Sequence, residues 1–221
     1  AQGRVVVEIA GLKLFQVAAA RSANQPQQTL YDYRWQPIEI QTAEHPAERW
    51  LILANTHDQF AKQLSNSLAA HGQQVDCLEQ SIEAASLGDW IKTQLQANYQ
   101  QIVCLWPLAA SNDQAPVANA TQQSLAMLTL LQTLSDSGSA TPRLWCVTRG
   151  AQAVLDHEVI NLAQAPLWGM LRSAALEHPE LAPSLIDLAP IAESNEANQL
   201  AKSLLQRANE HQQALRNQQQ L

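Results

Sequence analysis

The residues best placed for chemistry lie in the turn that follows the apolar run WLILAN at residues 50–55. His57 and Asp58 stand side by side there, and a histidine next to a carboxylate can work as a general base. No nucleophile motif such as G-x-S-x-G accompanies the pair. The six histidines also lack a ligand spacing such as H-x-x-x-H. The sequence therefore indicates neither a nucleophile with its base nor a metal site.

The same turn, NTHDQF, is where a dinucleotide-binding fold would hold its diphosphate, between a first strand and the helix that follows it. Such a site needs glycines, because the turn adopts positive φ and the backbone must approach the phosphates closely. None occurs between Ala54 and Gln63. Asn55 tolerates a left-handed conformation and Asp58 can cap the helix, but the Asp58 carboxylate and the Phe60 side chain oppose a bound anion. We predict an N-capped core helix here.

Reductase chemistry is missing as well. None of the three tyrosines has a lysine four residues later, so the Tyr-x-x-x-Lys pair of short-chain reductases is absent. Cys77, Cys104 and Cys146 lie in apolar runs without C-x-x-C spacing, which is typical of small buried hydrophobic residues in a reducing compartment. We therefore predict no catalytic, cofactor-binding or metal-binding residue in this chain.

The composition limits the class of protein. The 221 residues are 46% hydrophobic, as in a globular chain, and carry a net charge of −7, which argues against nucleic acid or an anionic membrane as a partner. No apolar run approaches the roughly 20 residues that cross a bilayer. The opening residues do not resemble a signal peptide. These features favour a cytoplasmic protein.

The elements that would position any site alternate between strand and helix. Apolar strands are expected near 50–55, 74–79, 101–107, 142–148 and 184–188. Helices are expected near 58–72, 88–99, 121–138, 165–181 and 193–211, of which 121–138 is strongly apolar, and a possible hairpin arm at 213–221. Strands that are apolar throughout and separated by helices indicate a mostly parallel, doubly wound sheet with helices on both faces. The fold class is α/β.

The first residues have a different pattern. Residues 4–17 favour β structure, and residues 18–29, AAARSANQPQQT, have the composition of a linker. The stretch LYDYRWQP then places Tyr31, Tyr33 and Trp35 on one face of a strand.

Three motifs resemble a known family when they are taken together: TPRLWCVTRGAQAV at 141–154, AQAPLWGMLRSAALEHPEL at 163–181, and LIDLAP at 185–190. They closely resemble the ketoreductase region of modular type I polyketide synthases, and more narrowly its structural, non-catalytic subdomain. LYDYRWQP is similar to the opening strand of that subdomain, and HQQALRN to its closing segment. The resemblance covers residues 30–221.

The resemblance implies a truncated Rossmann fold that holds no cofactor and braces a second, catalytic half. That half carries the glycine-rich NADPH loop and reduces a β-ketoacyl thioester on an acyl carrier protein to the β-hydroxyacyl thioester. Partners would be the catalytic ketoreductase subdomain, the acyl carrier protein and neighbouring domains of a multifunctional synthase. Residues 1–17 are similar to the last strands of a dehydratase domain, which would make 18–29 an interdomain linker. No activity is expected from this chain alone.

Several alternatives stay open. Trp168 anchors the seam between the two halves, or is a core tryptophan. Tyr31, Tyr33 and Trp35 pair their strand with the closing segment 212–216, or cover the domain's own sheet. Arg149 and Gly150 are expected to form a turn, and residues 177–179 either a buried polar network or a solvated helix end.

The function has a second candidate too. The chain could be an inactive pseudo-ketoreductase that organises neighbouring enoylreductase or methyltransferase domains. A free-standing small-molecule-binding domain is disfavoured because ligand motifs are missing.

Overall fold

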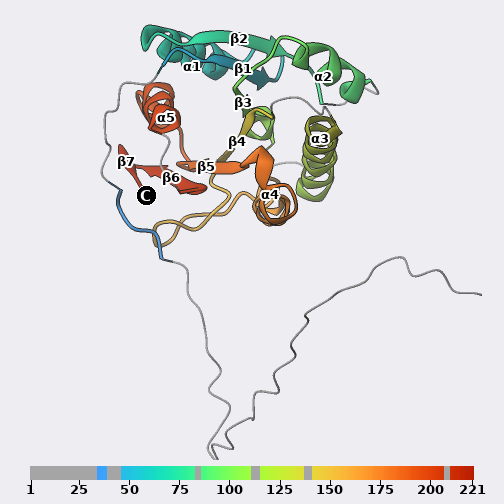
Figure 1. Ribbon diagram of the computed structural model, residues 1–221. Helices are drawn as coiled ribbons and strands as arrows, with labels where there is room; N and C mark the ends of the chain where they lie inside the picture. The colour runs from blue at the N-terminus through green and yellow to red at the C-terminus, as the bar shows by residue number, and fades with distance from the viewer. Residues whose placement is uncertain (1–33, 39–45, 83–85, 111–114, 137–140, 207–209) are drawn as a thin grey trace, which may run out of the picture. The chain divides into compact units, whose positions relative to one another are not determined.

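One sheet runs through the described part of the chain (Figure 1). The structure is a computed structural model that describes residues 34–38, 46–82, 86–110, 115–136, 141–206 and 210–221. The chain divides into two units, 1–34 and 35–221, and all the helices and strands described below belong to the second. The predicted tail 1–17, the linker 18–29, Tyr31 and Tyr33 lie outside the described residues.

The strands lie in the order β2-β1-β3-β4-β5-β6-β7. Their bounds are β1 Arg49–Ala54, β2 Gln74–Glu79, β3 Gln101–Cys104, β4 Arg143–Arg149, β5 Ser184–Leu188, β6 Gln212–Arg216 and β7 Gln219–Gln220. All neighbouring pairs are parallel except β6 and β7, which form an antiparallel hairpin. The predicted mostly parallel sheet and the hairpin arm are confirmed.

Helices cover both faces of this sheet (Figure 1). Their bounds are α1 Gln59–Ala70, α2 Leu87–Leu95, α3 Pro116–Asp136, α4 Pro166–Glu177 and α5 Glu196–Leu205. Buried residues of α1 and α5 share one apolar cluster with one face of the sheet, and those of α2, α3 and α4 share a second cluster with the other face. The central strands β1, β3, β4 and β5 are mostly apolar because each is covered on both sides. None of the helices in the described ranges is long and apolar enough to span a bilayer.

Several boundaries differ from the expected ones, and α2 and α4 each end four residues early, at Leu95 and Glu177. β3 ends at Cys104, because Pro107 cannot donate to a strand ladder and instead begins a short 3-10 helix, Trp106–Ala109. α3 begins at Pro116, well before residue 121, since proline is well suited to a first helical turn. α5 ends at Leu205, before the expected end at residue 211, and β6 begins at Gln212.

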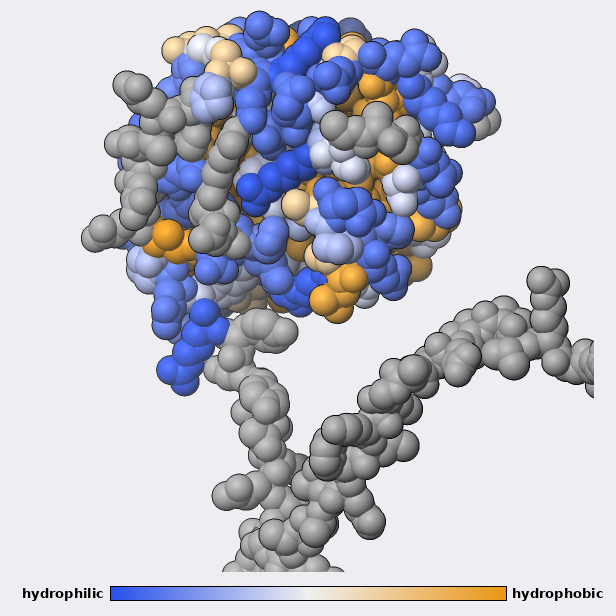
Figure 2. All heavy atoms as spheres, in the orientation of Figure 1, coloured by the Kyte–Doolittle hydropathy of each residue, from blue (hydrophilic) through white to orange (hydrophobic). Residues whose placement is uncertain are grey.

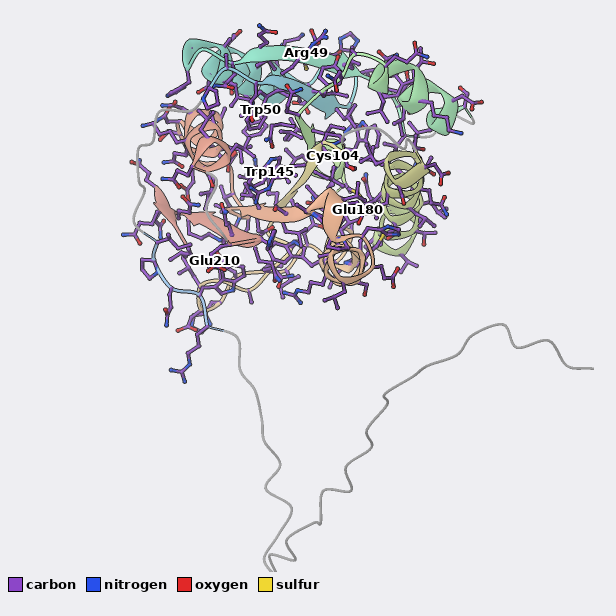
Figure 3. All side chains as sticks on the ribbon, viewed as in Figure 1. Arg49, Trp50, Cys104, Trp145, Glu180 and Glu210 are labelled. Carbon is purple, nitrogen blue, oxygen red and sulfur yellow. The ribbon has the colours of Figure 1, made fainter. Side chains whose placement is uncertain are left out.

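Tryptophans with bonded indole nitrogens fill the layer between the sheet and the α1–α5 side (Figure 3). The Trp50 indole donates to Gln73 Oε1 at 3.1 Å, and the Trp145 indole donates to Gln101 Oε1 at 2.8 Å. Both rings are buried. Each buried N–H therefore has a glutamine acceptor, which removes the cost of leaving a donor without a partner.

The pairing predicted between the opening segment and residues 212–216 is wrong for the residues that the structure describes. β6 has β5 on one side and β7 on the other, so neither of its edges is free. The opening segment instead reaches β7, where the Ile38 N–H donates to the Gln220 carbonyl at 2.9 Å.

Candidate functional site

The first place to look for a ligand is the point where the strand order reverses. β2 lies on one side of β1 and β3 on the other, and ligands of open α/β sheets bind outside the carboxyl ends of such strands. Here Trp106 follows β3 and is 1% exposed. Its carbonyl accepts from Asn55 Nδ2 at 3.1 Å and from Gln123 Nε2 at 3.4 Å. Side chains of this chain therefore close the crevice.

The helix start beside that crevice is also occupied. Asp58 Oδ1 accepts from the Ala61 N–H at 3.1 Å, so the predicted N-cap is confirmed. The left-handed residue of the turn is His57, with φ 63°, and not Asn55. The His57 N–H donates to Glu79 Oε2 at 2.7 Å. A diphosphate would meet two carboxylates here, so these residues do not fit NADPH.

The cysteines offer no nucleophile in this fold. Cys104 and Cys146 are fully buried, and Cys77 is half-buried. Burial raises the pKa of the Cys104 thiol to about 12 and holds that of Cys146 well above its ordinary value. The thiols stay protonated and pack as small apolar groups, as the sequence predicts for these two. Within the described ranges no cluster of His, Cys, Asp or Glu could hold a metal ion.

A buried charged cluster lies at the carboxyl ends of β4, β5 and β6, and Asp187 is at its centre. This carboxylate is fully buried. Oδ1 accepts from Thr148 Oγ1 at 2.6 Å and from the Ala151 N–H at 2.8 Å. Oδ2 accepts from Arg216 Nη2 at 2.7 Å and from the Gln152 N–H at 3.3 Å. We call these residues, together with Glu158, the Asp187 cluster.

Arg216 links the cluster to the hairpin and to the loop after β4. It is 2% exposed and donates through Nε to Glu158 Oε1 at 2.7 Å and through Nη1 to the Asp187 carbonyl at 2.8 Å. Burial, the largest single effect, raises the pKa of Glu158, but the hydrogen bonds from Arg216 and from the Val154 and Leu155 N–H groups, together with the charge of Arg216, outweigh burial and lower that pKa. Because the carboxylates and the guanidinium satisfy one another, the cluster ties the strands together and offers no free acid or base.

Arg149 and Gly150 occupy the same edge. Arg149 forms a two-pronged ion pair with Glu196 at 2.9 and 2.6 Å, which joins β4 to the start of α5. Gly150 has φ 63°, and a Cβ atom there would lie 3.2 Å from Pro190 Cα. This geometry supports the predicted turn at Gly150 and gives Arg149 a structural ion pair.

Trp168 lies in the core at 1% exposure, and its indole donates to Thr148 Oγ1 at 3.0 Å. The half-buried Trp35 meets it edge-on, with 6.0 Å between ring centroids and an interplanar angle of 77°. The Arg172 guanidinium lies 5.6 Å from the Trp168 centroid. The structure therefore brings together two of the four residues predicted for the subdomain interface, and the other two, Tyr31 and Tyr33, lie outside the described residues.

The end of α4 is solvated. His178 Nδ1 lies 3.1 Å from Glu180 Oε1 and 3.3 Å from Ser135 Oγ. The side chains of His178 and Glu180 are 40% and 49% exposed. Of the two alternatives for residues 177–179, the structure favours the solvated helix end.

A feature that sequence reasoning missed is the outer side of α3 and α4, which we call the α3–α4 face. Val117, Leu125 and Leu176 are 78%, 60% and 86% exposed there. A groove of about 570 Å³ runs between the two helices, and Leu128 and Met170 are among its lining residues. Apolar surface is visible over this region at the right and lower right of Figure 2. The signal in the sequence was that α3 carries no charged residue before its last, Asp136.

Comparison with known families agrees with this fold. Residues 33–221 match the family described as "Polyketide synthase extender module SpnB, Rossmann fold domain". The chain belongs to this family. The resemblance to the ketoreductase region of modular polyketide synthases is thereby confirmed.

Individual relatives of this Rossmann domain are parts of much larger synthases. It is 48% identical over 93 residues to the pikromycin polyketide synthase component PikAII of Streptomyces venezuelae, covering 41% of this chain and 2% of that protein. It is 26% identical over 225 residues to the phthioceranic/hydroxyphthioceranic acid synthase of Mycobacterium tuberculosis, covering 98% of this chain and 10% of that protein. The chain thus spans a tenth or less of both relatives.

A solved structure shows the same architecture. A C2-type ketoreductase from a modular polyketide synthase superposes with a TM-score of 0.66 at 31% identity. The match covers 79% of this chain and 40% of the ketoreductase chain. This domain is therefore a ketoreductase-type Rossmann domain of a modular polyketide synthase, similar to less than half of one solved ketoreductase.

Proposed function

We propose that this Rossmann domain is the structural, non-catalytic half of a polyketide synthase ketoreductase and that it braces a second, NADPH-binding half. The complete enzyme would reduce a β-ketoacyl thioester carried by an acyl carrier protein. The ketone carbon receives a hydride from NADPH and the oxygen receives a proton, which gives the β-hydroxyacyl thioester. On this proposal residues 30–221 form the structural half, and neighbouring synthase domains are its other partners.

The closed crevice supports the non-catalytic part of the proposal. Trp106 lies where the strand order reverses, and the carboxylates of Asp58 and Glu79 accept the N–H groups at the helix start. Each of these contacts would have to break before a diphosphate could bind. NADPH is accordingly assigned to the partner half.

The α3–α4 face is the observation that carries the bracing role. An exposed helix normally keeps charged residues on its solvent side, and α3 has none before Asp136. Val117, Leu125 and Leu128 are 78%, 60% and 40% exposed. Exposed apolar residues that line one groove mark an interaction surface.

The comparisons support the catalytic half as the occupant of that face. This domain matches 40% of the solved C2-type ketoreductase chain, so more than half of that chain has no counterpart in this domain. A body joined in the same chain is present at a high effective concentration, so it needs only a modest apolar surface to dock stably.

Bracing requires rigidity. Catalytic groups work only when they are held within roughly 0.5 Å of the productive geometry, and the elements behind them must not move. The Asp187 cluster supplies stiffness at the carboxyl edge by joining β4, β5 and β6. Trp168 fixes α4 on the sheet, and with Trp35, Tyr31 and Tyr33 it is the group of aromatic residues that we assign to the seam beside the catalytic half.

The test compares this chain with the complete ketoreductase polypeptide that contains it. The chain alone should neither reduce a β-ketoacyl thioester nor bind NADPH at micromolar concentration, and the complete enzyme should do both. Leu125→Asp with Leu128→Asp should lower the thermal stability and turnover of the complete enzyme and leave the midpoint of the isolated chain nearly unchanged. Ile191→Asp is the matched control, because Ile191 is 83% exposed on the loop between β5 and α5.

Two results would count against the proposal. Turnover by the chain alone would place the chemistry in this domain. A complete polypeptide that folds and binds no NADPH would favour the pseudo-ketoreductase that organises neighbouring domains.

A further inference from the structure

Gly169 lies in α4 at a position where nothing in the described chain requires a glycine. It lies three residues after the helix start at Pro166, is exposed, and has helical backbone. A Cβ atom built there would meet no atom within 4 Å. Glycine inside a helix is less favourable than alanine, because it loses more backbone freedom on folding. Within this chain, alanine would fit better.

Two of the other three glycines of the described ranges have a conformational reason. Gly72 and Gly150 have φ 79° and 63°, a conformation that other residues rarely adopt. A Cβ atom on Gly88 would lie 3.5 Å from Thr129 Cγ2, at ordinary van der Waals distance, so Gly88 faces the neighbouring helix α3 of this chain. Gly169 has neither a left-handed φ nor a neighbour in the described chain, so a helix that packs against it would come from outside the described chain.

The surroundings of Gly169 have the spacing of a helix-docking surface. Pro166, Gly169, Ser173 and Leu176 are exposed along one side of α4 at intervals of three, four and three, and the exposed Glu177 ends the helix on the same side. This is the interval that keeps a seam facing a partner helix in coiled-coil packing. Leu176, seven residues after Gly169 and so on the same side of the helix, is 86% exposed.

The neighbouring helix carries a similar stripe. Val117, Thr121, Leu125 and Leu128 are exposed along α3 at intervals of four, four and three. α3 and α4 lie side by side, and the groove between them continues past Leu128 toward His178. Two adjacent stripes of this kind form a surface on which helices can pack.

We propose that Gly169 is the point of closest approach between α4 and a helix of the catalytic half. The missing side chain lets the two helix backbones come closer than an alanine would allow, with Ser173 as a second small residue and Leu176 as an apolar contact beyond it. The inference rests on the proposed function, because the occupant is the part of the ketoreductase that lies outside the 40% match.

The experiment compares the change in Tm caused by one substitution in the isolated chain and in the complete ketoreductase, and the two changes should have opposite signs. In the isolated chain, Gly169→Ala should raise the Tm by about 2 °C, the usual effect of replacing an exposed helical glycine in a domain of this size. In the complete ketoreductase, the same change should lower the Tm and shorten the half-life of NADPH-dependent turnover at elevated temperature. Gly169→Leu should leave the isolated chain folded and affect the complete enzyme more strongly.

Asn66→Ala is the matched control. Asn66 is exposed in α1, on the opposite face of the sheet, and is also a weak helix former. This change should raise the Tm of the isolated chain and of the complete enzyme alike.

The outcomes separate the inference from the proposed function. If Gly169→Ala raises both Tm values, as the control does, nothing approaches α4 closely and the inference is wrong. If it lowers the Tm of the isolated chain, the glycine is needed within this domain and the inference is wrong as well. If the Leu125→Asp, Leu128→Asp pair leaves the complete enzyme unaffected, the bracing role fails, and the inference fails with it.

Discussion

Replacing Asp187 by asparagine tests how far the Asp187 cluster holds the domain together. The change keeps the shape of the side chain and turns one acceptor oxygen into a donor NH2 group. Both oxygens of Asp187 face donors: Thr148 Oγ1 and the Ala151 N–H on one side, and Arg216 Nη2 and the Gln152 N–H on the other. In either orientation, the asparagine amide therefore points its donor at two other donors.

The magnitude follows from burial. Asp187 is fully buried and Arg216 is 2% exposed, so water cannot replace the lost acceptor. Breaking a buried ion pair by removing one partner costs about 3–5 kcal/mol. Arg216 keeps its bonds to Glu158, which places the expected loss in folding free energy near the lower end, about 3 kcal/mol.

The assay is urea unfolding of the purified chain, followed by tryptophan fluorescence and circular dichroism. Asp156→Asn is the control, because Asp156 is exposed on the loop after β4 and its substitution should change stability by less than about 0.5 kcal/mol. A loss below about 1 kcal/mol for Asp187→Asn would refute the reasoning, since it would mean that the cluster relaxes around an amide.

Two further predictions concern the same edge of the sheet. Trp168→Ala should cost about 3–5 kcal/mol in unfolding experiments, as expected for a fully buried aromatic ring, and Trp168→Phe about 1 kcal/mol through loss of the indole hydrogen bond; equal costs for both would contradict this. The pKa of Glu158 is lowered in the folded chain, so its contribution to stability is present above the ordinary pKa of 4.5 and is lost as the pH falls through the folded value. Glu158→Gln should therefore lower the urea midpoint at pH 7. The difference in midpoint between the variant and the wild type should be smaller at pH 3, and an equal difference at both pH values would show that the charge is not involved.

Much of the fold could be predicted because the pattern of apolar residues in the sequence reflects which positions are buried. β1, β4 and β5 are apolar on both faces, and only a sheet covered by helices on both sides requires that. β6 is different. Its Gln213 is fully buried and bonded to Ser203 and Gln220, so polar pairs replace the apolar pattern there, and the helix before it was expected to run too far.

Little of the candidate site could be predicted from the sequence. Asp58 was predicted correctly as the N-cap of α1 from the turn NTHDQF, but Trp106 lies 51 residues after Asn55, and their contact exists only in the folded sheet. Asp187 was visible as an acid inside the apolar motif LIDLAP, yet its partner Arg216 follows 29 residues later. The exposed stripe of α3 could not be predicted, because the sequence shows that a residue is apolar and not which side of the helix is covered.

The closed crevice at Trp106 also has a thermodynamic consequence. A Rossmann domain that binds its nucleotide there gains folding free energy from the ligand, about 2.7 kcal/mol when the free nucleotide is at a hundred times its Kd. Here the end of β3 is held by the chain itself, because Asn55 and Gln123 donate to the backbone carbonyl of Trp106. The stability that these contacts give does not depend on the concentration of NADPH. If the proposed function holds, the support would be equally stable before, during and after each turnover of the catalytic half.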